Sequence, residues 1–374
     1  MEMKKNMFPD PSDYPSARLF SLDALRGLDM IVLTVFGSVV CAAQDAFGCF
    51  PDALMAQIDH RWQGFTFWDI IMPLFIFMCG AAIPFALGRR LQEGKGVFWR
   101  HVLVRVAMLW LLGGLVQGNW AELNPQTFSP FANTLQSIAV GYLATAAMMT
   151  VPSRVFQVAC PVVLSVGYAL LLAFGGDYSE TGNLAAKVDH AILSAILPAT
   201  NSYVAKPSVY AWFLPSMMFA AMTMCGYHAT TILRSAMTAW KKAGALFVYA
   251  AALFAAGAGT SVWIPLSKPI YTFSFTALAM GWCVLALAVL YVVCDIWKLR
   301  RGTSLVLLFG QNALTAYFVS SFFAKPLNAL AETLLPSVTT RCEPKVAAFF
   351  VAVLSAVELV AILVVKRRFA QMRH

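Results

Sequence analysis

Charge is what this 374-residue chain has least of. Charged residues make up 12% of it and hydrophobic residues 60%, whereas a soluble domain carries about 25% charged and 45–50% apolar residues. The composition therefore excludes an ordinary soluble enzyme, a disordered protein and a small secreted disulfide scaffold. The chain also lacks a Walker loop, a Rossmann glycine pattern, a Cys-x-x-Cys pair and any His/Cys cluster with metal-ligand spacing. We expect no metal.

Long apolar stretches take the place of charge. A spanning helix needs about 20 mostly apolar residues, and no stretch shows the alternation typical of a β-barrel strand. The sequence predicts an all-α, polytopic integral membrane protein with about ten transmembrane helices. The expected spans are 27–46, 66–87, 102–118, 134–151, 155–174, 210–233, 243–262, 271–294, 303–325 and 346–365.

The basic residues predict the orientation of these spans. With both termini cytoplasmic, 20 of the 27 Lys and Arg residues fall on the inner side, as the positive-inside rule requires. The net charge of +9 is thus explained by topology, and we expect no nucleic-acid partner. In a bacterial cell the chain would lie in the cytoplasmic membrane. Lys4 and Lys5 are followed by prolines and aspartates, so we expect the first span to stay as an anchor, not a signal peptide.

No linker or repeat divides the sequence. We expect a cytoplasmic tail over 1–20, a single transmembrane domain over 21–366 and a second cytoplasmic tail over 367–374. Most of the eight cysteines lie within spans, where they act as small apolar residues. Cys49 and Cys342 fall in outer loops, and whether they pair depends on whether that side is oxidising.

Ionisable residues lie at the inner mouth of the first span. Asp23 and Arg26 are three residues apart, so they share a helix face and can pair. Two interpretations stay open: a snorkelling anchor, or a binding site for an anionic ligand with Arg18 and Arg26 as donors. Asp29 lies one turn deeper, and a carboxylate at that depth needs a partner.

A second polar group lies at the outer mouth of the second span. An imidazole titrates near neutral pH, so His60 can serve as general base or acyl carrier. Asp59 or Asp69 would orient it. Trp62 is either an interfacial belt residue or part of a binding site. Other polar residues in or beside spans either form hydrogen bonds between helices or belong to a site. They are Arg105, Gln136, Lys268, Gln311, Asn312 and Glu358.

Several of these stretches, in order, resemble the membrane region of heparan-α-glucosaminide N-acetyltransferase and its bacterial relatives of the DUF5009 and DUF1624 types. The stretches are Arg18-x-x-Ser21-x-Asp23-x-x-Arg26-Gly27, Trp62-x-Gly64-x-x-x-x-Asp69 with Pro73 and Gly80, Leu135-Gln136, Ile264-Pro265-x-x-Lys268-x-x-Tyr271-Thr272-x-Ser274, and Gly310-Gln311-Asn312-Ala313. The resemblance runs from about residue 18 to residue 325.

This resemblance implies a transmembrane acyltransferase. Its members move the acetyl group of cytosolic acetyl-CoA to an amino sugar on the far side of the membrane, and some form homodimers. His60 is the counterpart of the family's catalytic histidine, with Asp69 beside it. We expect Arg18, Arg26, Arg100 and Arg105 to hold the CoA phosphates at the inner mouth, since arginine forks suit phosphate. Asp23 belongs to the same cofactor site as the partner of Arg26. Asp59, Trp62, Gln136, Lys268 and Asn312 would meet the acceptor or the oxyanion.

Some positions depart from the family pattern. His60 lies two residues before Trp62, where the family has three; Gly37 replaces an asparagine, Ser137 follows Leu-Gln in place of arginine, and the Asp-Pro-Glu-Gly motif before the sixth span is missing. The acceptor therefore stays open, and so do two alternatives: a secondary transporter of a sugar or small metabolite, and an acyltransferase that adds another acyl group to a cell-surface glycan.

Overall fold

The computed structural model describes residues 19–205 and 210–372. Within these residues all regular secondary structure is helical. Contacts divide the chain into two compact units, residues 1–59 with 289–374 and residues 60–288. The all-helical fold predicted from the sequence is confirmed.

The first unit contains ten helical elements among its described residues. They are α1 (Phe20–Ile31), the π-helical segment η1 (Val32–Phe36), α2 (Gly37–Phe47), α3 (Asp52–Met55), the π-helical segment η4 (Tyr291–Ile296), α13 (Ser304–Gln311), α14 (Ala313–Phe322), α15 (Ala324–Leu334), α16 (Pro336–Arg341) and α17 (Pro344–Met372). Helix α1 packs on α13, and α2 packs on α17.

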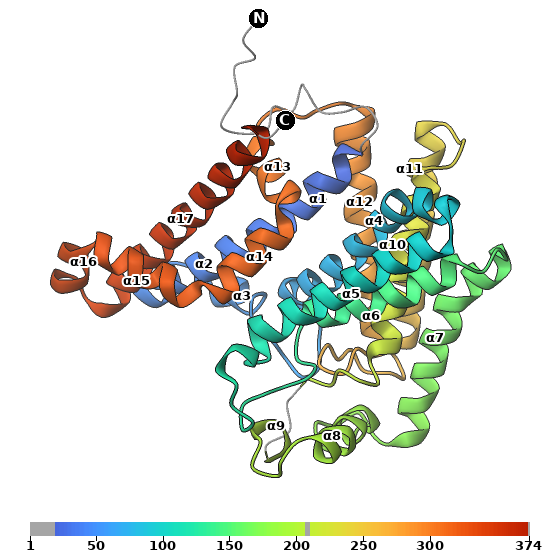
Figure 1. The fold of residues 1–374 in the computed structure, drawn as a ribbon, viewed down its shortest axis with the longest axis horizontal. Helices are drawn as coiled ribbons and strands as arrows, with labels where there is room; N and C mark the ends of the chain where they lie inside the picture. Colours follow the sequence, from blue (N-terminus) through green and yellow to red (C-terminus); the bar gives the residue numbers. More distant parts are fainter. Residues whose placement is uncertain (1–18, 206–209, 373–374) are drawn as a thin grey trace, which may run out of the picture. The chain divides into compact units, whose positions relative to one another are not determined.

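The second unit is built around α10. Its elements are η2 (Phe67–Ile70), α4 (Ile71–Glu93), α5 (Lys95–Gln117), η3 (Trp120–Glu122), α6 (Thr134–Met149), α7 (Arg154–Gly175), α8 (Leu184–Ile196), α9 (Ser202–Ala205), α10 (Ser216–Leu233), α11 (Ala239–Thr260) and α12 (Phe273–Leu290), which ends just past the boundary. Helix α10 contacts α4, α6 and α7 (Figure 1).

Glycines allow α4 and α10 to approach closely. A Cβ at Gly80 would lie 1.8 Å from the carbonyl oxygen of Thr223, and one at Gly226 would lie 2.0 Å from that of Phe77. Only a residue without a side chain fits such backbone contact, which is how helices in membranes commonly associate. The packing of these two helices holds the site described below, because the polar end of α4 carries part of it.

Seven helical runs in the described part of the chain are long and apolar enough to cross a membrane. Helices α13 and α14 would make an eighth, but they are bent by 78° at Asn312, so the predicted span 303–325 is not one straight helix. The two remaining predicted spans are also helical: α6 has only 16 residues, and α10 carries His228 and several threonines. These long apolar helices fit a multi-pass integral membrane protein.

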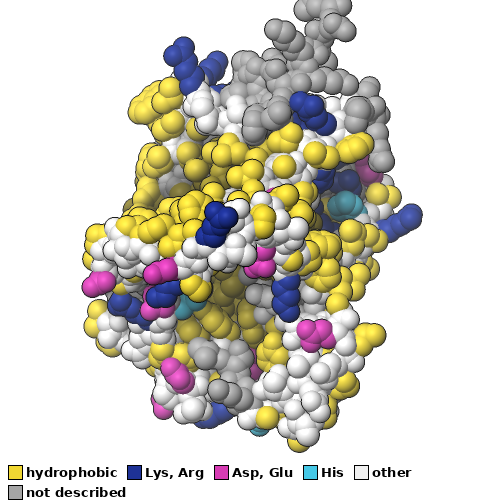
Figure 2. Space-filling view, turned by 90° about the vertical axis from the view of Figure 1, so that its left-hand side faces the viewer, with side chains coloured by type: hydrophobic (Ala, Val, Ile, Leu, Met, Phe, Trp, Pro, Cys, Tyr) yellow, Lys and Arg dark blue, Asp and Glu magenta, His cyan; other side chains and the backbone are white. Residues whose placement is uncertain are grey.

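The exposed surface is rich in apolar side chains, as that of a membrane protein must be. Hydrophobic side chains cover much of the face shown in Figure 2, and charged side chains occur there singly or in small groups. Many large apolar residues on the long helices are exposed, among them Val155, Val163 and Phe174 on α7. In water such exposure is unfavourable, whereas lipid tails solvate it.

Two further features of the described residues lie outside the predicted spans. Helix α8 lies between the predicted spans 155–174 and 210–233, and its first turn is capped by the Asn183 side chain, which accepts a hydrogen bond from the Ala186 N–H. Cys49 and Cys342 are both exposed, and neither forms a disulfide.

Candidate functional site

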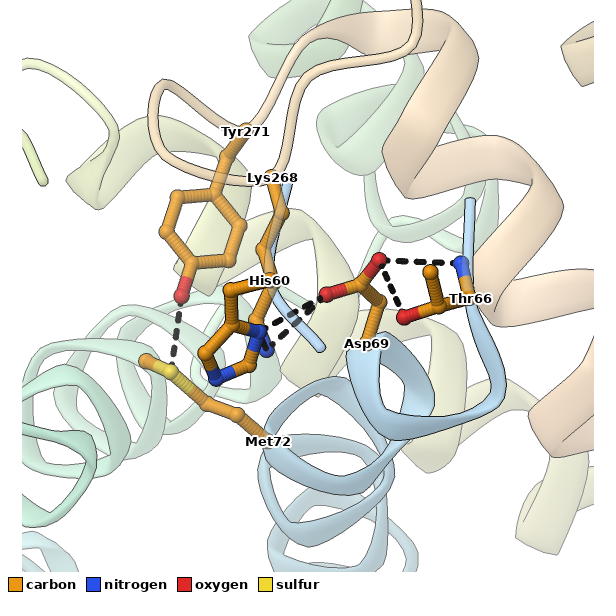
Figure 3. Close-up of polar contacts among 6 residues, drawn as sticks. All are labelled: His60, Thr66, Asp69, Met72, Lys268 and Tyr271. Atoms are coloured by element: carbon orange, nitrogen blue, oxygen red, sulfur yellow. Dashed lines mark hydrogen bonds and ion pairs between the residues drawn. The ribbon is translucent and has the colours of Figure 1, made fainter. Parts of the chain in front are cut away.

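Three ionisable side chains meet in the second unit, at the N-terminal end of α4. Asp69 Oδ1 lies 3.2 Å from His60 Nδ1 and 3.3 Å from Lys268 Nζ (Figure 3). The carboxylate and ammonium side chains are buried, with 3% and 7% of their surface exposed, whereas the imidazole is 46% exposed. A buried ion pair therefore supports a histidine whose outer edge is open to a ligand.

Local hydrogen bonds fix the carboxylate of Asp69. The residue lies in the 3-10 turn η2 that begins α4, and Thr66 caps this turn. Asp69 Oδ2 accepts the Thr66 backbone N–H at 3.0 Å and its hydroxyl at 2.9 Å. One carboxylate oxygen is thus occupied by the cap, and the other is left for His60 and Lys268. Thr66 does not figure among the residues predicted from the sequence, although the Thr-x-x-Asp spacing is a sequence signal that could have indicated this cap.

The loop that carries Lys268 is held by its own hydroxyl groups. Thr272 Oγ1 donates to the Pro265 carbonyl at 2.9 Å, and Ser274 Oγ donates to the Ile264 carbonyl at 2.8 Å. Tyr271 has a φ of +46° and is fully buried. A bulky residue with positive φ is strained, and such strain persists only where the surroundings enforce it.

The Tyr271 hydroxyl helps to enforce that conformation. It lies 2.7 Å from Met72 Sδ on α4 (Figure 3). The loop is therefore tied to the same helix that carries Asp69. This explains how a lysine almost 200 residues away along the chain is brought to the carboxylate.

The segment that carries His60 is tied to neighbouring loops. The Gly64 backbone N–H donates to the Leu266 carbonyl at 2.9 Å, with Gly64 at a φ of +127° that favours glycine. The Trp62 indole N–H donates to the Tyr178 carbonyl at 3.0 Å. Trp62, expected as a belt or acceptor residue, thus anchors the histidine segment.

The contacts of His60 define which tautomer can act as a base. Lys268 Nζ lies 3.4 Å from Nδ1, but an ammonium only donates, so it can bond to Nδ1 only when that nitrogen is unprotonated. When Nδ1 carries the proton, it donates to Asp69, and Nε2 is the ring nitrogen whose lone pair can accept a proton. Asp69 thus favours the tautomer that a general base requires.

Two side chains beside His60, those of Lys268 and Tyr210, have shifted pKa values. Burial lowers the pKa of the Lys268 ammonium from its usual value, and the Asp69 carboxylate opposes that change by stabilising the charge. Burial, together with the nearby Asp69 charge, raises the pKa of Tyr210 to about 12. The Tyr210 ring lies edge-on to the His60 ring, with 6.4 Å between centroids, so a protonated phenol borders the imidazole at neutral pH.

The other residues expected to bind the acceptor are divided between the two units: Gln136 lies in the second, and Asn312 and Asp59 lie in the first. The Gln136 side chain is fully buried and satisfied at the start of α6, accepting the Ala132 N–H at 2.8 Å and donating to the Pro130 carbonyl at 2.9 Å. Asn312 donates to the Leu308 carbonyl at the α13–α14 break, in the first unit. Asp59, the last residue of the first of that unit's two chain segments, is exposed. Gln136 therefore has a structural role in forming the α6 N-terminus.

The residues expected at the inner mouth divide between the two units. In the first unit Asp23 and Arg26 form the predicted pair at 3.0 Å, and Arg18 lies outside the described residues. In the second unit Arg100 is exposed, and the Arg105 guanidinium lies 4.9 Å from the centre of the Tyr142 ring.

The helices and the polar cluster are those of an all-helical, multi-pass membrane protein with a histidine–carboxylate–lysine site. Comparison with known families adds one finding: residues 18–117 match the model of a domain of unknown function, DUF5009. No curated protein shows a significant match to the chain. The matched region includes His60 and Asp69 and ends before Lys268, and it is consistent with the resemblance described above.

Proposed function

We propose that the protein is a membrane-bound acetyltransferase that moves the acetyl group of acetyl-CoA to the amine of an amino sugar of the glucosamine type. The observation that supports this proposal is the half-exposed imidazole of His60, bonded through Nδ1 to the buried carboxylate of Asp69. The family match over residues 18–117 adds to it.

The chemistry required of the site is modest. An acetyl thioester is already activated, so the acceptor amine attacks its carbonyl carbon, the new C–N bond forms and the C–S bond breaks. His60 Nε2 takes the proton that the amine loses and returns it to the departing thiolate, so that CoA leaves as the thiol. The Asp69 carboxylate stabilises the imidazolium while it exists. Lys268 contributes positive charge near the developing oxyanion.

The membrane topology gives each substrate its own side in this proposal. With ten spans and both termini cytoplasmic, the orientation that the basic residues predict, the His60 mouth would face outward. Acetyl-CoA would bind from the cytoplasmic side, with its phosphates on inner arginines of the second unit such as Arg100 and Arg105, and the sugar would arrive from outside. The acetyl group then crosses the membrane without passage of CoA. The active form in the bilayer would be a monomer or a homodimer.

The decisive test compares two histidine variants of the purified full-length protein. We expect His60→Ala to reduce formation of N-acetylglucosamine from acetyl-CoA and glucosamine by at least about 100-fold. The control is His228→Gln, because His228 hydrogen-bonds only a carbonyl of Gln157 in the described structure and should retain activity. Product should be followed by mass spectrometry, since the exposed Cys41, Cys49 and Cys342 would react with thiol reagents. Undiminished transfer by folded His60→Ala would refute the base role.

A secondary transporter remains the second candidate, because two observations in the first unit favour it. Helices α13 and α14 are bent by 78° at Asn312, as in a broken span or a re-entrant loop. Asp29 on α1 is 3% exposed with no hydrogen-bond partner for either carboxylate oxygen among the described residues. Broken helices and buried carboxylates occur at ion and substrate sites of transporters. Sugar counterflow in proteoliposomes without acetyl-CoA would support transport, whereas transfer of a longer acyl group would support the glycan-modifying alternative.

A further inference from the structure

Asp29 on α1 is a buried carboxyl group of the first unit that the chemistry above does not use. The residue is 3% exposed, and neither carboxylate oxygen has a hydrogen-bond partner among the described residues. An ionised carboxylate in such surroundings is unfavourable unless a counter-charge or hydrogen-bond donors compensate it. We propose that Asp29 is a proton-binding site that exchanges its proton with the inner mouth of the first span, and that Arg26 is the cation that replaces the proton.

The helical register places Arg26 between two carboxyl groups. Asp23, Arg26 and Asp29 follow one another at intervals of three residues, so each is a neighbour of the next on the helix surface. Arg26 Nη1 lies 3.0 Å from Asp23 Oδ1. Side chains on a helix lean toward its N-terminus, which directs Arg26 toward Asp23 and away from Asp29. This arrangement is the one expected when Asp29 holds a proton, because a neutral carboxyl group does not compete for the guanidinium.

Exposure decreases along these three residues. The side chains of Arg26 and Asp23 are 22% and 13% exposed, whereas Asp29 is 3% exposed. The basic residues predict that this end of α1 faces the cytoplasm. When Asp29 releases its proton to water at this mouth, its new negative charge attracts Arg26. The guanidinium keeps its own charge and leaves the more exposed Asp23 to water, so the proton and the guanidinium alternate as partners of Asp29.

The packing of α13 on α1 explains why this part of α1 is shielded (Figure 1). A Cβ at Gly27 would lie 1.8 Å from the carbonyl oxygen of Val306, and one at Gly310 would lie 2.0 Å from that of Asp23. Such contact between backbones leaves no room for water between the two helices. The π-helical segment η1 begins three residues after Asp29, and the α13–α14 pair that packs on α1 is bent by 78°. Both irregularities are frequent at functional sites.

Arg26 is the cation available to Asp29. The elements packed on α1 are η1, η4, α13 and α14, and the described residues of these elements include no lysine or arginine. Their titratable side chains are those of Tyr291, Cys294, Asp295 and Tyr317. Asp295 accepts the backbone N–H groups of Phe20 and Ser21 and lies 3.4 Å from Arg300, in the loop after η4. These contacts lie about two helical turns before Asp29.

A proton fits this site better than a metal ion does. Cations such as Mg²⁺ and Ca²⁺ need about six oxygen ligands, whereas a proton needs one carboxylate oxygen. The described part of the chain contains no group of three or more His, Cys, Asp or Glu side chains that could hold a metal ion. The proton site is independent of the proposed acetyl transfer, because its residues lie in the first unit and His60 lies in the second.

The test is infrared difference spectroscopy of the full-length protein in detergent, perfused first with alkaline and then with neutral buffer. A carboxylate that takes up a proton in this step gains the carbonyl band of a protonated carboxyl group. We expect a component of this band to be lost in Asp29→Asn. The same component should persist in Asp45→Asn, the matched control at an exposed position on α2.

A second comparison leaves Asp29 unaltered. In Asp23→Asn the guanidinium of Arg26 loses its partner and should pair with Asp29, which then stays ionised in neutral buffer, so the component should be lost. The double variant Asp23→Asn/Arg26→Gln lacks the competing charge and should regain it. A buried carboxyl group with a purely structural role would give the same spectrum in Asp23→Asn as in the unaltered protein.

Three outcomes would overturn the proposal. They are an unchanged spectrum in Asp29→Asn, an unchanged spectrum in Asp23→Asn, and loss of the component when sodium chloride replaces choline chloride, because a metal ion would then occupy the carboxylate. If Asp29→Asn gives no folded protein, the comparison of Asp23→Asn with the double variant decides alone. Acetyl transfer has no part in these measurements, so their failure would leave the proposed function standing.

Discussion

The buried pair of Asp69 and Lys268 gives the sharpest prediction about the site. Their charged atoms lie 3.3 Å apart, and two unit charges at that distance attract by about 5 kcal/mol at an effective dielectric constant of about 20. Asp69→Asn leaves a buried ammonium without its counter-ion, and breaking a buried pair in this way costs about 3–5 kcal/mol. We expect that loss in the free energy of unfolding.

The other single variant of this double-mutant cycle, Lys268→Met, should lose less unfolding free energy. In Lys268→Met the carboxylate keeps both hydrogen bonds from Thr66, so we expect a loss of about 1–3 kcal/mol. In the double variant no isolated charge remains. Its loss should therefore be smaller than the sum of the single losses by about 1–3 kcal/mol, the range found for residues in direct contact.

The assay is unfolding of the purified protein in mixed micelles, titrated with sodium dodecyl sulfate and followed by tryptophan fluorescence. The control cycle uses Arg89→Met and Glu93→Gln on α4, whose side chains are 87% and 44% exposed. For such a pair we expect a coupling within about 0.5 kcal/mol of zero. Additive losses at Asp69 and Lys268 would show that the two groups do not depend on each other, and the electrostatic account of the site would fail.

Three further predictions follow from particular contacts. Thr66→Val removes the hydroxyl that bonds Asp69, so we expect a loss of about 1.5–3 kcal/mol in unfolding free energy and slower acetyl transfer, both measured on the same preparation. The pKa of Asp189 is raised to about 6 on folding, so the folded state binds the extra proton. Its contribution to stability is complete below the unfolded pKa of about 4 and is lost as pH rises through about 6, a change of roughly 3 kcal/mol; the melting temperature of Asp189→Asn should lack this pH dependence. Gly226→Leu would drive a side chain into the α4 backbone, whereas a Cβ at Gly244 on α11 has nothing within 4 Å. We expect the first variant to fail to give folded protein, by gel filtration in detergent, and Gly244→Leu to behave normally.

Composition and apolar runs determined the class of protein, because a spanning helix satisfies its own backbone and is recognised from length and hydropathy. Every predicted span contains helix within the described residues, although α10 begins only at Ser216 and the span 303–325 is broken at Asn312. The Asp23–Arg26 pair followed from helical spacing. The count of ten spans and the cytoplasmic termini remain predictions. The bend at Asn312 has no such local signature, since neither proline nor glycine stands at that position.

The site itself was only partly visible in the sequence. His60 and Asp69 stood out because ionisable groups near a span are unusual, but nothing local indicated that Asp69 would pair with Lys268. That contact spans almost 200 residues and depends on the strained Tyr271 and its bond to Met72 on α4. The hydrogen bonds that Asp189 on α8 accepts from the Trp212 and Phe213 backbone were likewise hidden, because they join segments that only tertiary packing brings together. Local spacing determines helices and caps; contacts between distant loops are decided by the packing of the whole unit.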